Sequence, residues 1–196
     1  MNKNIALLAA VSAIALATSA NALEFRPYVG AQYNLTSHSI KDLHTNMDMH
    51  SYSVFVGTDY NRFFGTEVFY QNSNKWHKVY EGNKIKSDFA AYGLDVYGYL
   101  PLGCDRVFSL LGTAGIANYD YTFQGTKTNN TQGQPAGTSE GFKSEENGLG
   151  YRLGAGMQYN ITNNIAVRGI VRYIWADKLD GFDHMMEYSL GAKYSF

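Results

Sequence analysis

The sequence has a single cysteine, Cys104, only three prolines, and no strong excess of charge of either sign. One cysteine excludes an internal disulfide, so other interactions must stabilise the fold. A formal net charge of −1 lacks the basic excess typical of nucleic-acid-binding proteins, and we predict no nucleic-acid partner. Beyond residue 22, no run of about 18 apolar residues occurs, which excludes a membrane-spanning helix there. Tyrosine is abundant, with 16 residues, and this suits an all-strand fold.

The first residues have the pattern of a secretory signal peptide. Lys3 gives a positive start, residues 5–17 are apolar, and Ala20-Asn21-Ala22 supplies the small residues of a cleavage site. The apolar run is shorter than the roughly 20 residues that a spanning helix needs. We therefore predict a cleaved signal peptide over residues 1–22 and one mature domain over residues 23–196, with an uncleaved N-terminal anchor as the alternative.

Apolar and polar residues alternate with a period of two in eight segments of the mature chain. Because successive side chains leave a strand on opposite faces, this alternation predicts strands. The predicted strands cover residues 25–35, 51–60, 64–71, 90–100, 108–123, 149–159, 165–175 and 186–196. In one of them, Tyr119 and Tyr121 leave the apolar phase set by Phe108 and Leu110, which predicts a β-bulge near Asn118.

Charged residues avoid the apolar phase of these eight segments. Apart from Asp120, which follows the predicted bulge, all of them lie in the opposite phase: Arg26, Asp59, Glu67, Asp95, Arg152, Arg168, Arg172, Glu187 and Lys193. A lysine or arginine facing lipid at the bilayer midplane costs about 2 to 4 kcal/mol, whereas one on a soluble surface costs nothing. Large aromatic residues also cluster toward both ends of the apolar phase, as in the girdles of membrane barrels. The pattern favours an apolar face turned to lipid over the alternative, a soluble barrel or sandwich with an apolar core.

The connections between the predicted strands alternate in length. Short turns at 61–63, 101–106 and 160–164 alternate with longer loops near 36–50, 72–88, 120–147 and 177–183. Outer-membrane barrels have short periplasmic turns and long extracellular loops. Spanning strands must also close without edges, because each unpaired backbone group costs several kcal/mol in hydrocarbon. We predict an all-β fold, an eight-stranded antiparallel up-and-down transmembrane β-barrel in the bacterial outer membrane.

Four stretches carry a resemblance to a known family: FRPYVGAQYNL, FGTEVFYQ, YRLGAGMQYN and YSLGAKYSF. They resemble strands of the small eight-stranded outer-membrane barrels of the OmpA, OmpX and opacity-protein type, and the resemblance extends over the mature chain. It implies outer-membrane lipid and the barrel assembly machinery as partners. It also implies that the C-terminal residues form the assembly signal: Leu190, Ala192, Tyr194 and Phe196.

The predicted interior and loops suggest different roles. An eight-stranded barrel is just wide enough for side chains to fill, so the inward charges predict a hydrogen-bonded network and not a water channel. A gated pore of low conductance is the alternative. Residues 123–147 are rich in Gly, Thr, Asn, Gln and Ser, which predicts a mobile loop that contacts a host or cell-surface ligand. A solvated spacer without a ligand is the alternative.

Neither a metal site nor a catalytic motif stands out. His38, His44 and His50 are six residues apart, which matches no standard zinc pattern, so we predict no metal and no cofactor. His184 and Ser189 are five residues apart on one predicted strand, so they face opposite ways and do not form a simple dyad. We predict a non-enzymatic structural and surface-interaction protein, adhesin-like or antigen-like, with an outer-leaflet lipid-modifying enzyme as the alternative.

Overall fold

The computed structural model describes residues 25–40, 46–74, 76–80, 83–103, 107–128, 139–176 and 182–196. The predicted signal peptide and His44 lie outside these ranges. None of the described residues forms a helix long and apolar enough to cross a membrane. The described residues form nine strands: β1 (Arg26–Ile40), β2 (Asn46–Asp59), β3 (Phe64–Ser73), β4 (Trp76–Tyr80), β5 (Asn83–Leu102), β6 (Phe108–Thr128), β7 (Ser139–Asn160), β8 (Ile165–Ala176) and β9 (Phe182–Ser195).

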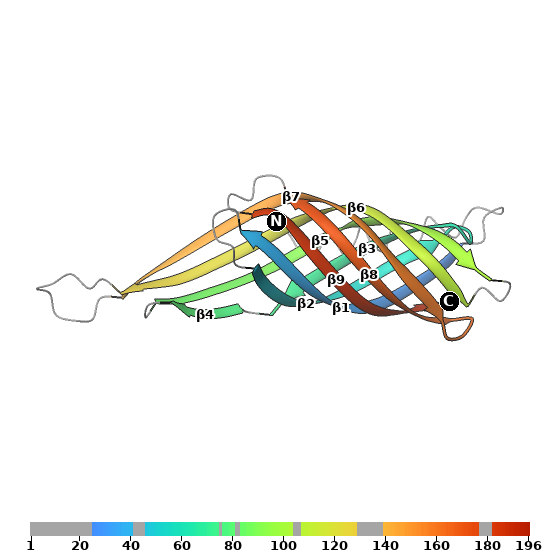
Figure 1. The fold of residues 1–196 in the computed structure, drawn as a ribbon, viewed down its shortest axis with the longest axis horizontal. Coiled ribbons are helices and arrows are strands. Elements are labelled where there is room, and N and C mark those ends of the chain that lie inside the picture. Colours follow the sequence, from blue (N-terminus) through green and yellow to red (C-terminus); the bar gives the residue numbers. More distant parts are fainter. Residues whose placement is uncertain are drawn as a thin grey trace, which may run out of the picture.

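The strands form one antiparallel sheet that closes on itself into a barrel (Figure 1). Sheet neighbours follow the order β3-β2-β1-β9-β8-β7-β6-β5-β4, and a further pairing of β3 with β5 completes the ring. Strands that are consecutive in sequence pair with each other, except that β3 pairs with β5 and not with β4, and β1 pairs with β9 to join the first and last strands. The predicted antiparallel up-and-down barrel is confirmed.

Strand β4 continues β3 and is not a separate strand of the barrel wall. Asn72 of β3 pairs with Ala90 of β5, and Trp76 of β4 pairs with Ser87 of the same strand. Four steps along the first strand (76 − 72) therefore match three steps along β5 (90 − 87), which is the signature of a one-residue bulge. The barrel wall is therefore eight-stranded, although β3 and β4 are two separate segments of one of its strands.

The apolar phase of the strands lies on the outside of the barrel, as predicted. On the outer face Leu190 is 69% exposed and Val54 is 60% exposed, while inward residues such as Tyr28 and Arg172 are fully buried. Exposed aromatic residues form two belts, one at the short-turn end (Phe64, Phe108, Tyr159, Phe196) and one nearer the other end (Tyr33, Tyr52, Tyr70, Tyr151, Trp175, Tyr188). A continuous apolar surface of this extent indicates contact with lipid.

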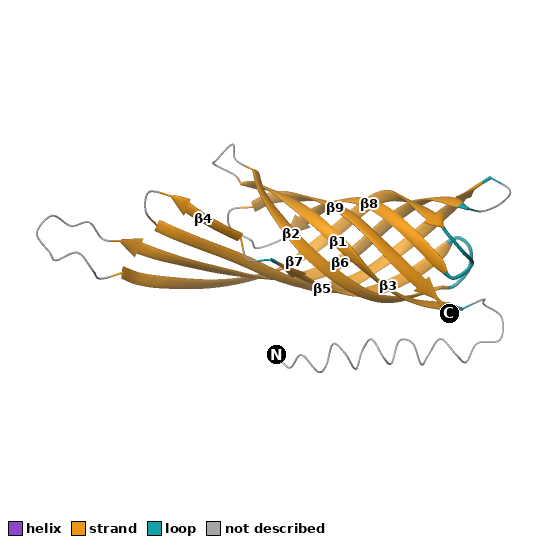
Figure 2. Cartoon of the chain, turned by 90° about the horizontal axis from the view of Figure 1, so that it is seen from below, coloured by secondary structure: helices purple, strands orange, loops and turns teal. Residues whose placement is uncertain are grey.

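Three strands are much longer than the others. Strands β5, β6 and β7 have 20, 21 and 22 residues, whereas β8 has 12. The ladder between β6 and β7 runs on to the pair Thr128–Ser139, but the ladder between β7 and β8 ends at Gly150–Ala176. The outer ends of β5 (83–87), β6 (119–128) and β7 (139–149), together with β4, form a projecting sheet at the end of the barrel away from Phe196 (Figures 1 and 2).

Two sequence predictions are wrong in this region. Residues 123–128 and 139–147, predicted as part of a mobile loop, continue β6 and β7, and residues 76–80 and 83–88 form strand where a loop was expected. These strands could not be predicted from residue composition, because they are held by backbone hydrogen bonds across the hairpin, which do not depend on the type of side chain. The predicted bulge near Asn118 is also absent, since the β6 ladder to β7 keeps one register throughout. Tyr119 and Tyr121 simply point inward, each with 1% exposure.

Candidate functional site

The barrel interior brings together eight of the nine charged residues singled out from the sequence. Four are cations (Arg152, Arg168, Arg172, Lys193) and four are acids (Asp59, Glu67, Asp95, Glu187). Seven of these side chains are at most 4% exposed, and Asp59 is 19% exposed. The formal charges cancel, as they must where charges lie in a space shielded from water.

Glu67 and Arg168 form a bidentate pair inside the barrel. Arg168 Nη1 donates to Glu67 Oε2 at 2.7 Å, and Nη2 donates to Oε1 at 2.8 Å. Tyr28 Oη also donates to Oε2 at 3.2 Å, and the guanidinium carbon lies 4.0 Å from the centre of the Phe55 ring. Parallel hydrogen bonds between ionised groups are among the strongest in proteins, so this pair is expected to fix the relative position of β3 and β8 across the barrel.

Glu187 is the centre of a second cluster. Its Oε1 accepts from Arg152 Nη2 at 3.0 Å and from Arg172 Nη1 at 3.1 Å, and its Oε2 accepts from Gln71 Nε2 at 2.8 Å. Asp95 Oδ2 lies 3.8 Å from Arg152 Nη2 and 3.6 Å from Arg172 Nη2, close enough for ion pairing. Two acids therefore share two guanidinium groups at this level of the barrel.

Tyr97 joins the two clusters. Its hydroxyl accepts from Arg172 Nη2 at 2.8 Å and donates to Glu67 Oε1 at 3.3 Å. A third pair, Lys193 Nζ with Asp59 Oδ2 at 2.8 Å, lies closer to the short-turn end. The hydrogen bonds through Tyr97 link β3, β5, β8 and β9 into one buried polar network, so the loss of one member affects several strands.

Arg26 does not belong to this network, contrary to the sequence prediction. Its side chain is exposed and donates to the backbone carbonyl of Asn163, in the turn between β7 and β8. Arg26 is the first residue of β1, so it lies at the rim, where a long side chain reaches solvent instead of the interior. Alternation alone cannot distinguish a lumen position from a rim position.

An aromatic cap fills the interior beyond the charges, toward the projecting sheet. It consists of Phe89, Tyr119, Tyr121, Met49 and Met185, each at most 2% exposed. The Phe89 and Tyr121 rings stack with centroids 5.3 Å apart, and Tyr121 Oη donates to Met185 Sδ at 3.1 Å. Sequence reasoning missed Phe89 and Met185 because the predicted strands began one residue after them, and Met49 because its strand began two residues after it. Extending the inward phase by two residues from Ala91, Ser51 and Glu187 would have found them.

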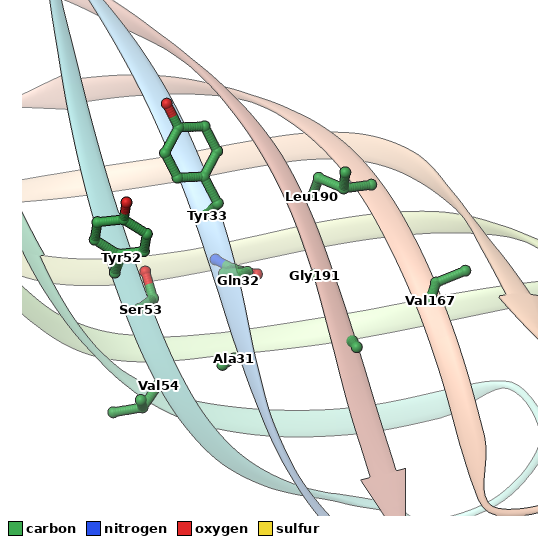
Figure 3. A pocket seen from close by; sticks show the side chains of 10 residues that line it. Ala31, Gln32, Tyr33, Tyr52, Ser53, Val54, Val167, Leu190 and Gly191 are labelled. Atoms are coloured by element: carbon green, nitrogen blue, oxygen red, sulfur yellow. The ribbon is translucent and has the colours of Figure 1, made fainter.

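Three residues of the predicted assembly signal, Leu190, Ala192 and Tyr194, lie on the outer face of β9, and Phe196 follows the end of that strand. Leu190 is 69% exposed, Phe196 is 66% exposed and Tyr194 is 46% exposed, and Ala192 is exposed beside them. Leu190 and Ala192 also line an apolar groove on the outside of the wall, together with Ala31, Val167, Tyr33 and Tyr52 (Figure 3). The groove opens to the surroundings of the barrel, not to its interior.

Two histidines, His50 and His184, pack against tyrosine rings. His50 stacks on Tyr33 and shares a hydrogen bond with its hydroxyl, and the His184 ring lies 5.1 Å from that of Tyr173. Ser189 is buried and accepts from Arg172 at 2.8 Å, so it faces the interior. Among the described residues, no three His, Cys, Asp or Glu side chains are arranged to hold a metal ion.

Comparisons with known proteins agree with this architecture. A family model described as "Outer membrane protein beta-barrel domain" matches residues 6–196. The fold is similar to that of Neisserial surface protein A, with a TM-score of 0.65 and 15% identity over 87% of this chain and 97% of that one. It is also similar to Ail, the attachment invasion locus protein of Yersinia pestis, with a TM-score of 0.57 and 18% identity over 89% and 100% of the two chains. No curated protein sequence matches significantly.

Proposed function

The chain belongs to the outer membrane protein β-barrel family and lies in the bacterial outer membrane, and from this premise we propose that it is a non-enzymatic surface protein that binds ligands through its projecting sheet. The observation that carries the proposal is the length of β5, β6 and β7 beyond the end of β8. A barrel that only crossed the bilayer would need strands of about 9 to 11 residues. The extra residues present a broad β-surface outside the membrane.

The filled interior supports a binding role over a pore. Arg172, Glu187 and Tyr97 are all 0% exposed, and the aromatic cap lies between them and the projecting sheet. Conduction would require the shared guanidinium groups and the cap to separate together, which leaves charges unpaired at a cost of several kcal/mol. We therefore expect no steady conductance when the purified protein is added to a planar bilayer.

The remaining partners follow from the outer face. The apolar belt between the two aromatic girdles is suited to outer-membrane lipid, and the groove beside Ala31 and Ala192 is shaped to take part of an acyl chain. The exposed residues at the end of β9 (Leu190, Ala192, Tyr194, Phe196) are accessible to the barrel assembly machinery before lipid covers them.

A role at the cell surface is consistent with the names of the two similar structures, a surface protein of Neisseria and an attachment invasion protein of Yersinia. Sequence identities of 15% and 18% support a shared fold but give no information about the ligand. The proposal for this chain therefore depends on the projecting sheet and on direct measurement.

The test compares cells that display the full chain with cells that display a shortened hairpin. Deleting residues 123–144 and joining Thr122 to Glu145, which pair across the hairpin, by an Asn-Gly turn removes most of the β6–β7 extension and keeps the barrel. We expect adhesion to host cell layers to fall to background while heat-modifiable migration is kept. Removal of residues 77–86, which form the β4 side of the same sheet, shows in a second variant whether that side also contributes to adhesion. Full adhesion by both variants, or acyl release from lipid A by the purified protein, would contradict the proposal.

A further inference from the structure

The projecting sheet has two open edges. Residues 139–149 of β7 pair with β6 on one side, and the described strands include no ladder partner on the other side. Strand β4 likewise pairs with β5, and no other described strand pairs with it. Both edges lie outside the barrel wall, where β4 and β7 border the sheet (Figures 1 and 2). Open strand edges present rows of backbone donors and acceptors that can pair with another strand.

Strand direction decides which edges of two copies can pair as an antiparallel ladder. Strand β4 runs away from the barrel, because it continues β3, and β7 runs toward it. All copies in a membrane are inserted with the same orientation, so contact between β4 and β7 of different copies is antiparallel. Contact between two β7 edges, or between two β4 edges, would be parallel, which is the slightly weaker pairing.

The charges of the two edges are complementary. The β4 edge, residues 76–80, contains Lys78 and no acid, a net charge of +1. The β7 edge, residues 139–149, contains Glu140, Glu145 and Glu146 against Lys143, a net charge of −2. Pairing of unlike edges therefore brings opposite charges together, whereas pairing of like edges brings like charges together.

The spacing of the barrels also permits this contact. Neighbouring strands are about 4.8 Å apart and are tilted about 40° from the membrane normal. Four such strands in a flat sheet occupy ~25 Å measured parallel to the membrane, which is the repeat distance of a continuous sheet. The same geometry gives an eight-stranded barrel a backbone diameter of about 16 Å, and two walls in contact lie about 10 Å apart, so neighbouring axes are about 26 Å apart. A continuous sheet above the membrane and touching barrels within it thus require nearly the same repeat.

The tilt also sets the register. The row of paired residues through Tyr70 and Tyr92 reaches β7 at Leu149, two residues farther from the barrel than the belt residue Tyr151. Each row of paired residues therefore lies farther from the membrane at β7 than at β4. A second copy displaced by ~25 Å in the membrane plane stays at the same height. Each residue of its β4 therefore lies opposite a β7 residue about 5 positions nearer the barrel than the β7 residue of the same row within one copy. The row of residues 76–80 meets β7 at residues 140–144, so residues 76–80 of the second copy lie opposite residues 145–149, which include Glu145 and Glu146.

We propose that the β7 edge of one copy pairs with the β4 edge of a second copy, so that neighbouring chains form a continuous antiparallel sheet above the membrane. The contact is head-to-tail and leaves a free edge at each end, so it extends into a row of barrels. The partner is this chain itself, and the inference does not depend on the ligand-binding role proposed above.

Mixed crosslinking in lipid vesicles tests the proposal. Two differently tagged full-length chains, both Cys104→Ser, carry Asn147→Cys on β7 or His77→Cys on β4, and a short bis-maleimide joins cysteines that lie close together. We expect the mixed dimer to exceed either like dimer several-fold. Glu145→Lys with Glu146→Lys on the first chain should lower its yield about fivefold, and Lys78→Glu on the second chain should restore part of it.

Heat-modifiable migration verifies that every variant still folds. With the two chains in equal amounts, a mixed dimer no more than twice as abundant as either like dimer would mean random collision and would overturn the proposal, as would the absence of a mixed dimer or insensitivity to charge reversal. Loss of the mixed dimer with adhesion of the full chain intact would overturn self-association alone, whereas full adhesion by the shortened-hairpin variant with crosslinking of the full chain intact would overturn the ligand-binding role alone.

Discussion

Glu67→Ala is expected to destabilise the barrel strongly. Glu67 accepts both guanidinium bonds of Arg168, at 2.7 and 2.8 Å, and further bonds from Tyr28 and Tyr97. Removal of the carboxylate leaves the Arg168 guanidinium with Gln32 Oε1, at 3.2 Å, as its hydrogen-bond acceptor among the described residues. A buried charge that loses its partner costs about 3 to 5 kcal/mol, and we expect the free energy of unfolding to fall by that amount.

Urea unfolding of the refolded protein in detergent micelles, followed by tryptophan fluorescence, measures this change. The unfolding midpoint should shift while the slope with denaturant stays constant, because the exposed surface is unchanged. Arg26→Ala is the matched control, since the exposed Arg26 should change stability by less than about 0.5 kcal/mol.

A double variant tests the cause of the loss. Glu67→Ala combined with Arg168→Met removes both charges, and such replacements of buried ion pairs are often nearly neutral. It should therefore be more stable than Glu67→Ala alone. An unchanged midpoint for Glu67→Ala, or a double variant that is weaker than the single one, would refute the reasoning.

Three further predictions use the same unfolding measurement. Tyr97→Phe removes the hydroxyl between Arg172 and Glu67 and should cost about 1 to 3 kcal/mol; no loss would mean that the two clusters are independent. Gly154→Ala places a methyl group 2.7 Å from the Val171 carbonyl oxygen and 2.8 Å from Arg172 Cγ, so it should lower stability, whereas Gly112→Ala, with no atom within 4 Å, should be tolerated. Val171→Arg on the outer face should cost about 2 to 4 kcal/mol in lipid vesicles, and a neutral effect would argue against a lipid-facing position.

The wall of the barrel could be predicted from the sequence because one period governs it. Alternation with a period of two assigns each side chain to a face, and closure follows from the cost of unpaired backbone in lipid. The same rule placed eight inward charges, including Glu67 and Arg168, in the interior. It failed at Arg26, where the strand ends at the rim and the rule no longer decides what surrounds the side chain.

The pairing within the interior could not be predicted. Glu67 and Arg168 are separated by 101 positions in sequence, and their contact depends on the strand register and tilt around the barrel. The projecting sheet was missed for a different reason. Residues 123–128 and 139–147 have the composition of a loop, and only the cross-strand ladder makes them strands.

The most direct test of the account asks which side of the wall meets lipid. Leu153→Trp, in a chain with Trp76→Phe and Trp175→Phe, places a single tryptophan on the outer face between the two aromatic belts. Refolded into vesicles of brominated lipid, this chain should show strong quenching relative to unbrominated lipid. Unquenched fluorescence, with the chain remaining dissolved without detergent or lipid, would contradict a barrel that holds its charges inside and its apolar face in the membrane.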